Sequence, residues 1–439
     1  MTSSGPIPLA LLGALLLSAC SSMEDAGFGG AGGGGGQGGS GGVGGFHDIP
    51  LEVSAVAVGA SHSCAVTVVG GVSCWGSGAR GQLGDGISGK DYHRATPAPV
   101  VGISGAVGVR AGGDTTCAVL YGGGVWCWGE GAFGQLGDGV AEDGHLSAVP
   151  VEVLDLTGVL DLDVTAQTAC AALADDTVRC WGRNSPDEWL GFASAECGPY
   201  AVYTGDGGPT LMTFPCEPTP RVVLGAVGAD HIASGGEHTC ALSPEGPARC
   251  WGADHFGQLG DGQFGPDAHS GKPVEVQQLE GARQLALGTS HTCAVVGPAS
   301  KVLCWGDNSY GQLGIGSSAL DSYKITPTEV PDLSGVTDLH ASSHTTCASR
   351  SDGSVVCWGD TSMVLPPVTM KGISIVPTPV PGAADVATVH SGGGHVCALR
   401  LDQTVMCWGN NDRGQLGNGT VGLPDFSLMP VAAPPGDPQ

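Results

Sequence analysis

The chain has 439 residues, of which 78 are Gly and 29 are Pro, so residues that interrupt helices are too frequent for a mainly helical fold. Lys and Arg number 16 against 42 Asp and Glu, and a formal net charge of −26 repels phosphate backbones and anionic lipid headgroups. Nucleic acid is therefore not expected as a partner. Hydrophobic residues make up 41% of the chain and charged residues 13%, which predicts a folded core rather than disorder.

Residues 1–19 are predicted to form a lipoprotein signal peptide. The apolar run from Ile7 to Ala19 is too short to span a membrane, and its end, LSAC at residues 17–20, resembles a bacterial lipobox. Cys20 is then the predicted lipidation site, and the Ser21 that follows favours the outer membrane. The segment before the apolar run lacks the Lys or Arg of a typical signal peptide, so the true start codon stays open. A buried apolar strand is the alternative.

Residues 20–45 are predicted to be a flexible linker, because 14 of the 19 residues from Gly27 to Gly45 are Gly. A coil of this length reaches about 25–30 Å. The folded part, predicted to span residues 46–435, is therefore expected to stay close to the membrane.

The tripeptide Cys-Trp-Gly occurs seven times at intervals of 50 to 70 residues, so one unit is repeated along the chain. Another Cys precedes each copy, with nine intervening residues or ten in the fifth unit, which is the spacing of two strands joined by a turn. Cysteines that face each other across a hairpin lie within disulfide range, and such regular pairing indicates an oxidising compartment rather than the cytosol. The two further cysteines in the third unit are expected to pair with each other. The predicted disulfides are Cys64–Cys74, Cys117–Cys127, Cys170–Cys180, Cys197–Cys216, Cys240–Cys250, Cys293–Cys304, Cys347–Cys357 and Cys397–Cys407.

A His lies two residues before the first Cys in four units, and His-x-Cys is also a possible pair of zinc ligands. A zinc site needs four converging ligands, yet three units carry Thr instead of His at this position. We therefore expect hydrogen-bonding core residues and no metal site. The four residues are His62, His238, His291 and His395, and the three Thr are Thr115, Thr168 and Thr345.

Four short strands are expected in each unit. The Cys-to-Cys hairpin supplies two, and a turn that reads Gly-Gln-Leu-Gly in five units follows, where Leu should pack inward and Gln should bond to main chain. A strand marked by Pro and Val comes next, as in residues 149–153, and an apolar strand leads to the following unit. The Pro-Val pattern also occurs in residues 49–53 and 429–431, so either terminus could close a ring. Radial repetition of four strands predicts an all-β, seven-bladed β-propeller.

The combined pattern resembles the regulator of chromosome condensation repeat. In the fourth unit, for instance, GEHTCAL at residues 236–242 precedes Cys-Trp-Gly at 250–252 and Gly-Gln-Leu-Gly at 257–260. The resemblance implies a seven-bladed propeller, and members of the family include a nuclear guanine-nucleotide exchange factor, a plant ultraviolet photoreceptor and a secreted bacterial β-lactamase inhibitor. Seven of the nine Trp belong to the repeated tripeptide and are expected to pack between blades, which leaves Trp126 and Trp189 outside the pattern.

Function is expected where the repeat breaks, because a feature present in every blade serves the scaffold. Residues 184–219 form the largest break, where Glu-Trp-Leu-Gly replaces Gly-Gln-Leu-Gly and a segment with two further cysteines is inserted. Aromatic side chains on such a braced loop favour partner recognition, since they bury a large area at a small entropic cost. The alternative, that they fold the insertion onto its own blade, is equally favoured. The predicted binding residues are Trp189, Phe192, Tyr200, Tyr203 and Phe214.

A catalytic role finds no support, because the sequence has no Gly-x-Ser-x-Gly elbow in a strand-turn-helix setting, no His-Glu-x-x-His and no discernible carboxylate pair. We therefore expect a monomeric, non-enzymatic lipoprotein without cofactor or metal, periplasmic or displayed on the cell surface, that binds a protein or glycan partner. The alternatives are a guanine-nucleotide exchange factor for a small GTPase, which would need the cytosol, and a secreted-type enzyme inhibitor.

Overall fold

The fold comes from a computed structural model of the chain, which describes residues 52–185, 188–203, 209–244, 246–318, 322–366 and 372–432. All of these residues belong to the second of two compact units, Asp48–Gln439. The predicted signal peptide, the lipidation site Cys20 and the Gly-rich linker lie outside the described residues. Within the described part, no helix is long and apolar enough to cross a membrane.

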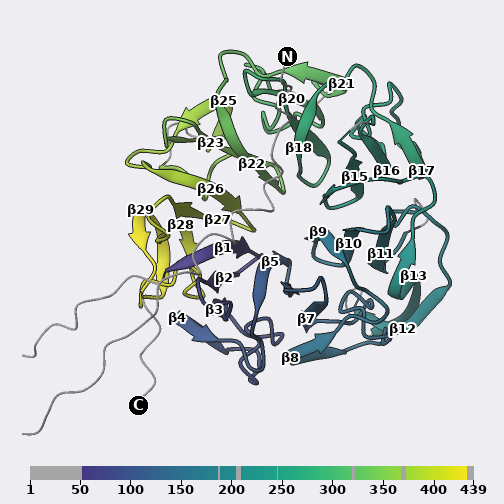
Figure 1. Cartoon of the computed structure of the whole chain (residues 1–439), viewed down its shortest axis with the longest axis vertical. Helices are drawn as coiled ribbons and strands as arrows, with labels where there is room; N and C mark the ends of the chain where they lie inside the picture. Colours follow the sequence, from purple (N-terminus) through teal and green to yellow (C-terminus); the bar gives the residue numbers. More distant parts are fainter. Residues whose placement is uncertain are drawn as a thin grey trace, which may run out of the picture. The chain divides into compact units, whose positions relative to one another are not determined.

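Seven antiparallel sheets stand radially around a central axis, and each sheet is one blade (Figure 1). Six blades have four strands in chain order, and blade 3 has five. The all-β, seven-bladed propeller with four-stranded blades is thereby confirmed. Blades 1 and 2 consist of β1 (Val53–Val58), β2 (His62–Thr67), β3 (Val72–Ser77), β4 (His93–Pro99), β5 (Ala106–Gly112), β6 (Thr115–Leu120), β7 (Val125–Glu130) and β8 (Leu146–Glu152).

Blade 3 departs from the others because a β-hairpin extends its outer edge. Its fourth strand, β13, pairs with β11 on one side and with the additional strand β12 on the other. The strands of blade 3 are β9 (Val159–Val164), β10 (Thr168–Leu173), β11 (Val178–Arg183), β12 (Glu196–Tyr203) and β13 (Pro209–Val222).

The last four blades return to the regular pattern. Blades 4 and 5 consist of β14 (His231–Ser234), β15 (His238–Leu242), β16 (Arg249–Ala253), β17 (His269–Glu275), β18 (Ala282–Leu287), β19 (His291–Val296), β20 (Lys301–Gly306) and β21 (Lys324–Glu329). Blades 6 and 7 consist of β22 (Val336–Ser342), β23 (Thr345–Arg350), β24 (Val355–Asp360), β25 (Ile373–Pro379), β26 (Val386–Ser391), β27 (His395–Arg400), β28 (Val405–Asn411) and β29 (Gly422–Pro430).

All eight predicted disulfides are present. Seven of them join the second and third strands of a blade, where the two cysteines lie directly opposite each other in the ladder, as Cys64 and Cys74 do. The eighth, Cys197–Cys216, joins β12 to β13. Cross-links of this kind restrict the unfolded chain and so offset part of the entropy that a Gly-rich chain loses on folding.

The ring closes by packing of blade 7 against blade 1. Val53 at the start of β1 donates its N–H to the carbonyl of Gln403 at 2.9 Å, and its side chain joins a buried cluster with Leu399 and Val405 of blade 7. Met429 and Pro430 lie in β29, the fourth strand of blade 7 itself. Among the described residues, neither terminus therefore supplies a strand to the blade at the other end of the chain.

The Gly-Gln-Leu-Gly turn has the inward Leu and the main-chain bond of Gln that its composition predicts, and it also joins neighbouring blades. In blade 1, Leu83 is buried in the core shared with blade 2, and the Gln82 side-chain carbonyl accepts the Arg80 N–H at 2.8 Å. The main-chain carbonyl of Gln82 accepts the indole N–H of Trp128 from blade 2 at 2.9 Å. Gly84 has a φ of +67°, and a Cβ there would lie 2.8 Å from that indole nitrogen, so only Gly fits.

The four predicted core histidines each bond to the neighbouring blade. Nε2 of His62 lies 2.7 Å from the hydroxyl of Thr116, and this hydroxyl donates its one hydrogen to the Gln82 carbonyl at 3.1 Å. The imidazole must therefore carry its proton on Nε2 and donate it. His238, His291 and His395 bond in the same way to hydroxyls of the next blade. Their role as hydrogen-bonding core residues is confirmed.

Candidate functional site

The hairpin insertion in blade 3 extends beyond one end of its blade. Cys216 of β13 lies opposite Arg183, the last residue of β11, so the part of β13 that precedes Cys216 has no partner in β11 and pairs with β12 alone. The same end of every blade carries the loop that joins its first and second strands, such as residues 59–61 in blade 1. We call this side of the propeller the insertion face.

Arg183 lies at the centre of an aromatic cluster that ties the insertion to blade 2. Its guanidinium carbon lies 5.1 Å from the ring centre of Phe133, 5.6 Å from that of Trp189 and 4.8 Å from that of Phe214. Tyr200 packs against Phe133 and Phe214 with ring centres 5.0 and 5.8 Å away. The Tyr200 hydroxyl also donates to a main-chain carbonyl of blade 2 at 3.0 Å. Cation–π and ring contacts thus brace the hairpin at its base.

The structure brings together three of the predicted binding residues, Trp189, Tyr200 and Phe214, but packs them inward. Tyr200 is buried, which agrees with the packing alternative for this residue. Phe192 lies apart from them, against the core of its blade and under the Arg221 guanidinium at 4.7 Å. The side chain of Tyr203 lies outside the described part. A role of these residues in binding stays a prediction.

The insertion exposes two large apolar side chains, beside polar ones such as Glu196 and Thr210. Leu211 and Met212 of β13 are 66% and 41% exposed and lie opposite Ala201 and Tyr200 of β12. Because consecutive residues of a strand point to opposite faces, Leu211 is on the face of Ala201, and Met212 is on the face of Tyr200. The aromatic residues of the insertion did not indicate this pair. The sequence could have indicated it by two consecutive large apolar residues between Thr210 and Thr213, in a segment otherwise rich in Gly and Pro.

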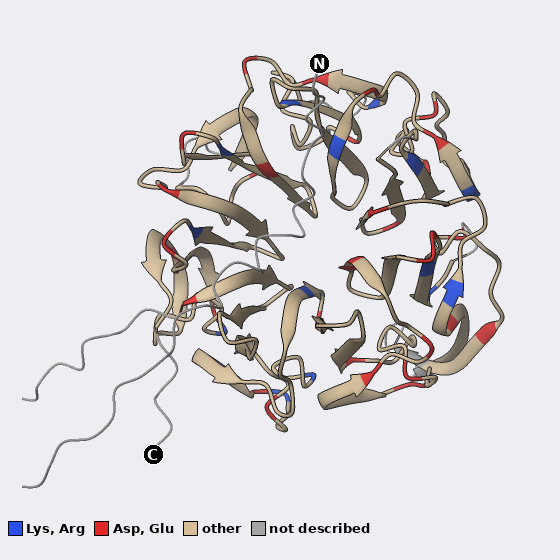
Figure 2. Cartoon of the chain, in the orientation of Figure 1, with Lys and Arg blue, Asp and Glu red and all other residues tan. Residues whose placement is uncertain are grey.

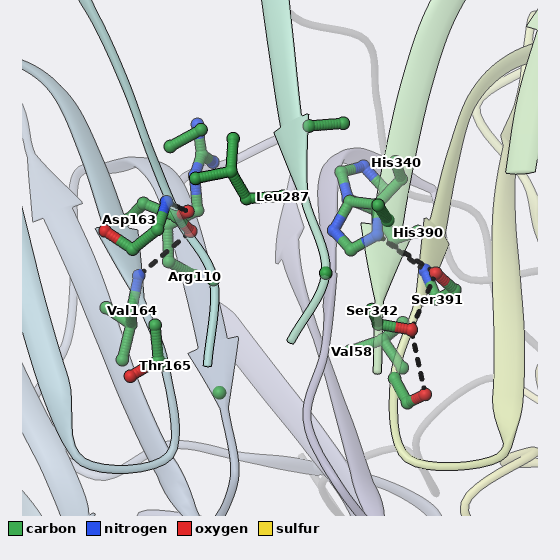
Figure 3. A pocket seen from close by; sticks show the side chains of 18 of the residues that line it. Val58, Arg110, Asp163, Val164, Thr165, Leu287, His340, Ser342, His390 and Ser391 are labelled. Carbon is green, nitrogen blue, oxygen red and sulfur yellow. Dashed lines mark hydrogen bonds between the residues drawn. The ribbon is translucent and has the colours of Figure 1, made fainter. Parts of the chain in front are cut away.

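A second candidate site is the central channel, a cavity of about 400 Å³ lined by the inner strands of all seven blades (Figure 3). One ring of lining positions lies opposite the first Cys of each blade. Arg110, Asp163, His340 and His390 occupy this position in blades 2, 3, 6 and 7. The other three blades carry Ala there. Around the ring, Ala in blade 1 and Ala in blades 4 and 5 thus separate a polar pair in blades 2 and 3 from a polar pair in blades 6 and 7.

On one side of the channel, charged groups link consecutive blades. Arg110 bonds to Asp161 at 3.0 Å, and Asp161 accepts the Nδ1 hydrogen of His231 at 2.7 Å. Burial by itself raises the pKa of Asp161, but His231 and Arg110 outweigh it and lower the pKa to about 2. Burial raises the pKa of Asp163 to about 6, against the N–H bond it accepts from Ser234. This wall therefore holds one firmly ionised carboxylate and one that titrates near neutrality.

The opposite side of the channel is lined by neutral imidazoles. Nδ1 of His340 accepts the main-chain N–H of Ser391 at 3.2 Å, and the rings of His340 and His390 meet edge to face at 5.3 Å (Figure 3). Burial lowers the pKa of His340 to about 3 and that of His390 to about 4. Neutral hydrogen-bonding groups of this kind suit polar uncharged ligands. Within the described residues, no group of three His, Cys, Asp or Glu is arranged to hold a metal ion.

Comparison with known proteins agrees with this architecture. A model of the RCC1-like domain matches residues 30–365, and a model of the regulator of chromosome condensation (RCC1) repeat matches residues 386–415. The chain is thus a disulfide-linked seven-bladed propeller with a polar channel and one inserted hairpin. It belongs to the RCC1-like domain family.

Individual relatives share the propeller but differ in size. The E3 ubiquitin-protein ligase HERC2 of Homo sapiens is 32% identical over 268 residues, which are 60% of this chain and only 5% of HERC2. The ultraviolet-B receptor UVR8 of Arabidopsis thaliana is 29% identical over 317 residues, 71% of this chain and 66% of the receptor. The crystal structure of Prp20p from Saccharomyces cerevisiae superposes with a TM-score of 0.66 at 20% identity and covers 84% of this chain and 87% of Prp20p.

Proposed function

We propose that this protein is a non-enzymatic binding module, anchored by a lipid on Cys20 to the outer membrane of a bacterium, that captures a protein or glycan partner on its insertion face. The observation that carries the proposal is the hairpin of blade 3. Among the described residues it occurs in one blade only, a disulfide and the Arg183 cluster brace it, and it exposes Leu211 and Met212. A projection that is braced at its base and exposes apolar side chains supports partner recognition, because bracing reduces the conformational entropy lost when a partner covers it.

The compartment is tested by the intact mass and thiol count of the protein recovered from the membrane fraction of its host. We expect a chain that begins at acylated Cys20 and has no free thiol, since the described cysteines form eight disulfides. A chain that begins at Met1 in the soluble fraction and has reactive thiols would contradict the anchor.

The binding face is tested by glycan-array binding and by cross-linking on intact cells, with Leu211→Ser/Met212→Ser as the variant. We expect the double variant to lose partner capture while its melting temperature stays unchanged, because both side chains are exposed. Leu423→Ser is the matched control, since Leu423 is an exposed Leu on β29, far along the chain from the insertion. Equal capture by both variants would place the binding surface elsewhere.

The alternative of a guanine-nucleotide exchange factor draws its support from the likeness to Prp20p, which binds Gsp1p and histones. That likeness concerns the fold. Asp and Glu are distributed around the blades and exceed Lys and Arg (Figure 2), which does not favour contact with nucleic acid. A secreted-type enzyme inhibitor remains the second alternative, and an intact enzyme among the cross-linked partners would favour it.

A further inference from the structure

The face opposite the insertion carries an arc of exposed apolar side chains. This hairpin face consists of the turns between the second and third strands of each blade together with the segments that enter the next blade. The two sets of loops bond to each other around the ring, as Ala106 N–H does to Gly70 and Leu401 N–H does to Asp385. Its five most exposed large apolar residues are Val69 (87%), Tyr121 (89%), Leu224 (81%), Val227 (70%) and Leu401 (71%).

The arc covers blades 7, 1, 2 and 3 but not the rest of the ring. The first residue after the fourth strand is a buried Val in each of these blades, but the second is exposed and apolar in blades 1 to 3, where it is Val101, Leu154 or Leu224. In blades 4 to 6 the same position holds Gln277, Pro331 or Pro381. Hairpin tips follow a similar but not identical division: blade 1 exposes Val68 and Val69, blade 2 Tyr121 and blade 7 Leu401, whereas the tip of blade 3 reads Ala-Asp-Asp-Thr and the described tip residues of blades 4 to 6 are Ser, Pro, Gly, Ala and Asp. Exposed loop positions that are equivalent in the blades are thus apolar on one side of the ring and mostly polar on the other. The propeller fold itself does not account for this difference.

The chain enters the propeller on this same face. Glu52, the first described residue, accepts the N–H of Val68 at the tip of blade 1, and the next residue, Val53, bonds to the tip of blade 7. The 51 residues that precede Glu52 therefore join the propeller in the middle of the apolar arc. If Cys20 carries the lipid, a coil from Cys20 to Glu52 places the membrane end only about 28–34 Å away from this point.

We propose that the apolar arc of the hairpin face rests on the interfacial region of a lipid bilayer with zwitterionic headgroups. Val, Leu and Tyr side chains are suited to this interface, Tyr in particular because its ring is apolar and its hydroxyl stays hydrated. Asp and Glu lie beside the arc, among them Glu52, Asp155, Asp176 and Asp402, and Arg179 and Arg400 are engaged in ion pairs with neighbouring Asp. Contact is therefore expected with neutral lipid and not with anionic lipid.

Docking in this manner would give the anchored propeller one orientation. The hairpin face would point to the bilayer, while the insertion and the end of the channel beside it would point to the aqueous space. This inference rests on the proposed lipid anchor for its setting, but the docking surface itself belongs to the propeller and can be tested without the lipid.

The experiment uses the full chain in two forms, lipidated at Cys20 and as the unlipidated Cys20→Ser variant. Both are mixed with phosphatidylcholine vesicles, and side-chain oxidation by hydroxyl radicals is read by mass spectrometry. We expect Tyr121, Leu224 and Leu401 to be protected at least about fivefold, while Leu423, which is 89% exposed on β29, stays fully reactive. Phosphatidylglycerol in the vesicles should reduce the protection.

A second measurement is the partition of the unlipidated chain onto the same vesicles. The variant Val69→Ser/Tyr121→Ser/Leu401→Ser should lower this partition about tenfold, and the control Val376→Ser/Val421→Ser/Leu423→Ser should not.

The outcomes separate this inference from the proposed function. Protection in the Cys20→Ser chain supports docking even where mass spectrometry finds no acyl group, in which case only the anchor fails. If the chain is acylated but its two faces are oxidised equally on vesicles, the proposed anchor stands and the proposed docking is wrong. Protection of the arc without vesicles that grows with protein concentration would also overturn it, because a second copy of the chain would then be the occupant.

Discussion

Six of the seven junctions between blades are built alike, and the junction between blades 3 and 4 differs. In the six, the Trp of Cys-Trp-Gly donates its indole N–H to a main-chain carbonyl of the preceding blade at 2.9–3.0 Å. One of these carbonyls belongs to Val364, in the blade that lacks Gly-Gln-Leu-Gly. Trp251 is equally buried, but its indole N–H has no acceptor among the described residues. A turn can thus change its sequence and keep the junction, whereas the turn that precedes the insertion loses this bond.

The largest effect is expected from removing the junction Trp. Trp128→Ala should lower the free energy of unfolding by about 3–5 kcal/mol, because it leaves a large cavity between blades 1 and 2 and an unpaired carbonyl. Urea unfolding under non-reducing conditions measures the change. Trp126→Ala is the control, since Trp126 lies outside the Cys-Trp-Gly pattern and is only half-buried. If the two substitutions were equally destabilising, the inter-blade Trp would have no special role.

The histidine junctions predict a loss of stability in acid. Burial lowers the pKa of His62, His238, His291 and His395 to about 3, from an unfolded value near 6.5. The unfolded chain therefore binds more protons below pH 6.5, so the stability is fully present above this pH and falls as the pH approaches 3. Each imidazole accounts for at most about 2 kcal/mol between pH 6.5 and 5.

A titration of the melting temperature checks this dependence, with His291→Thr as the variant. Thr is the residue that the chain itself places at this position in blades 2, 3 and 6. The variant should have a shallower slope between pH 6.5 and 5, whatever its stability at neutral pH. An unchanged slope would show that His291 does not stay neutral in the folded protein.

The blades were predictable because each of their features recurs. Cys-Trp-Gly, the Cys spacing and Gly-Gln-Leu-Gly appear at matching places, so strands, disulfides and packing could all be inferred before any coordinates. The channel was not, because its lining position holds Ala, Arg, Asp or His in different blades and gives no motif. For the insertion, the aromatic residues stood out, but which of them face inward depends on the register of β12 with β13, and composition does not determine it.

A smaller effect on the free energy of unfolding should distinguish the junction of blades 1 and 2 from the junction of blades 3 and 4, which lacks the indole hydrogen bond. Trp128→Phe removes the indole N–H that bonds to Gln82, while Trp251→Phe removes an N–H without an acceptor. Both lose similar volume, so Trp128→Phe should be more destabilising by about 1 kcal/mol. Equal values in urea unfolding would mean that the indole hydrogen bonds contribute nothing to the junctions.

The smallest effect on stability is expected from the exposed apolar residues of the hairpin inserted in blade 3. Leu211→Ser/Met212→Ser should change the free energy of unfolding by no more than about 0.5–1 kcal/mol, because Leu211 is 66% exposed and Met212 is 41% exposed. Tyr200→Ala, on the opposite strand of the same hairpin, should lower it by about 2–4 kcal/mol, since it opens the Arg183 cluster. Thermal unfolding of the two variants side by side tests whether the stability of the hairpin depends on Tyr200 rather than on the exposed apolar pair. A large loss in the Leu211→Ser/Met212→Ser variant would mean that the apolar pair supports the fold, and the insertion would then lose its claim as a recognition surface.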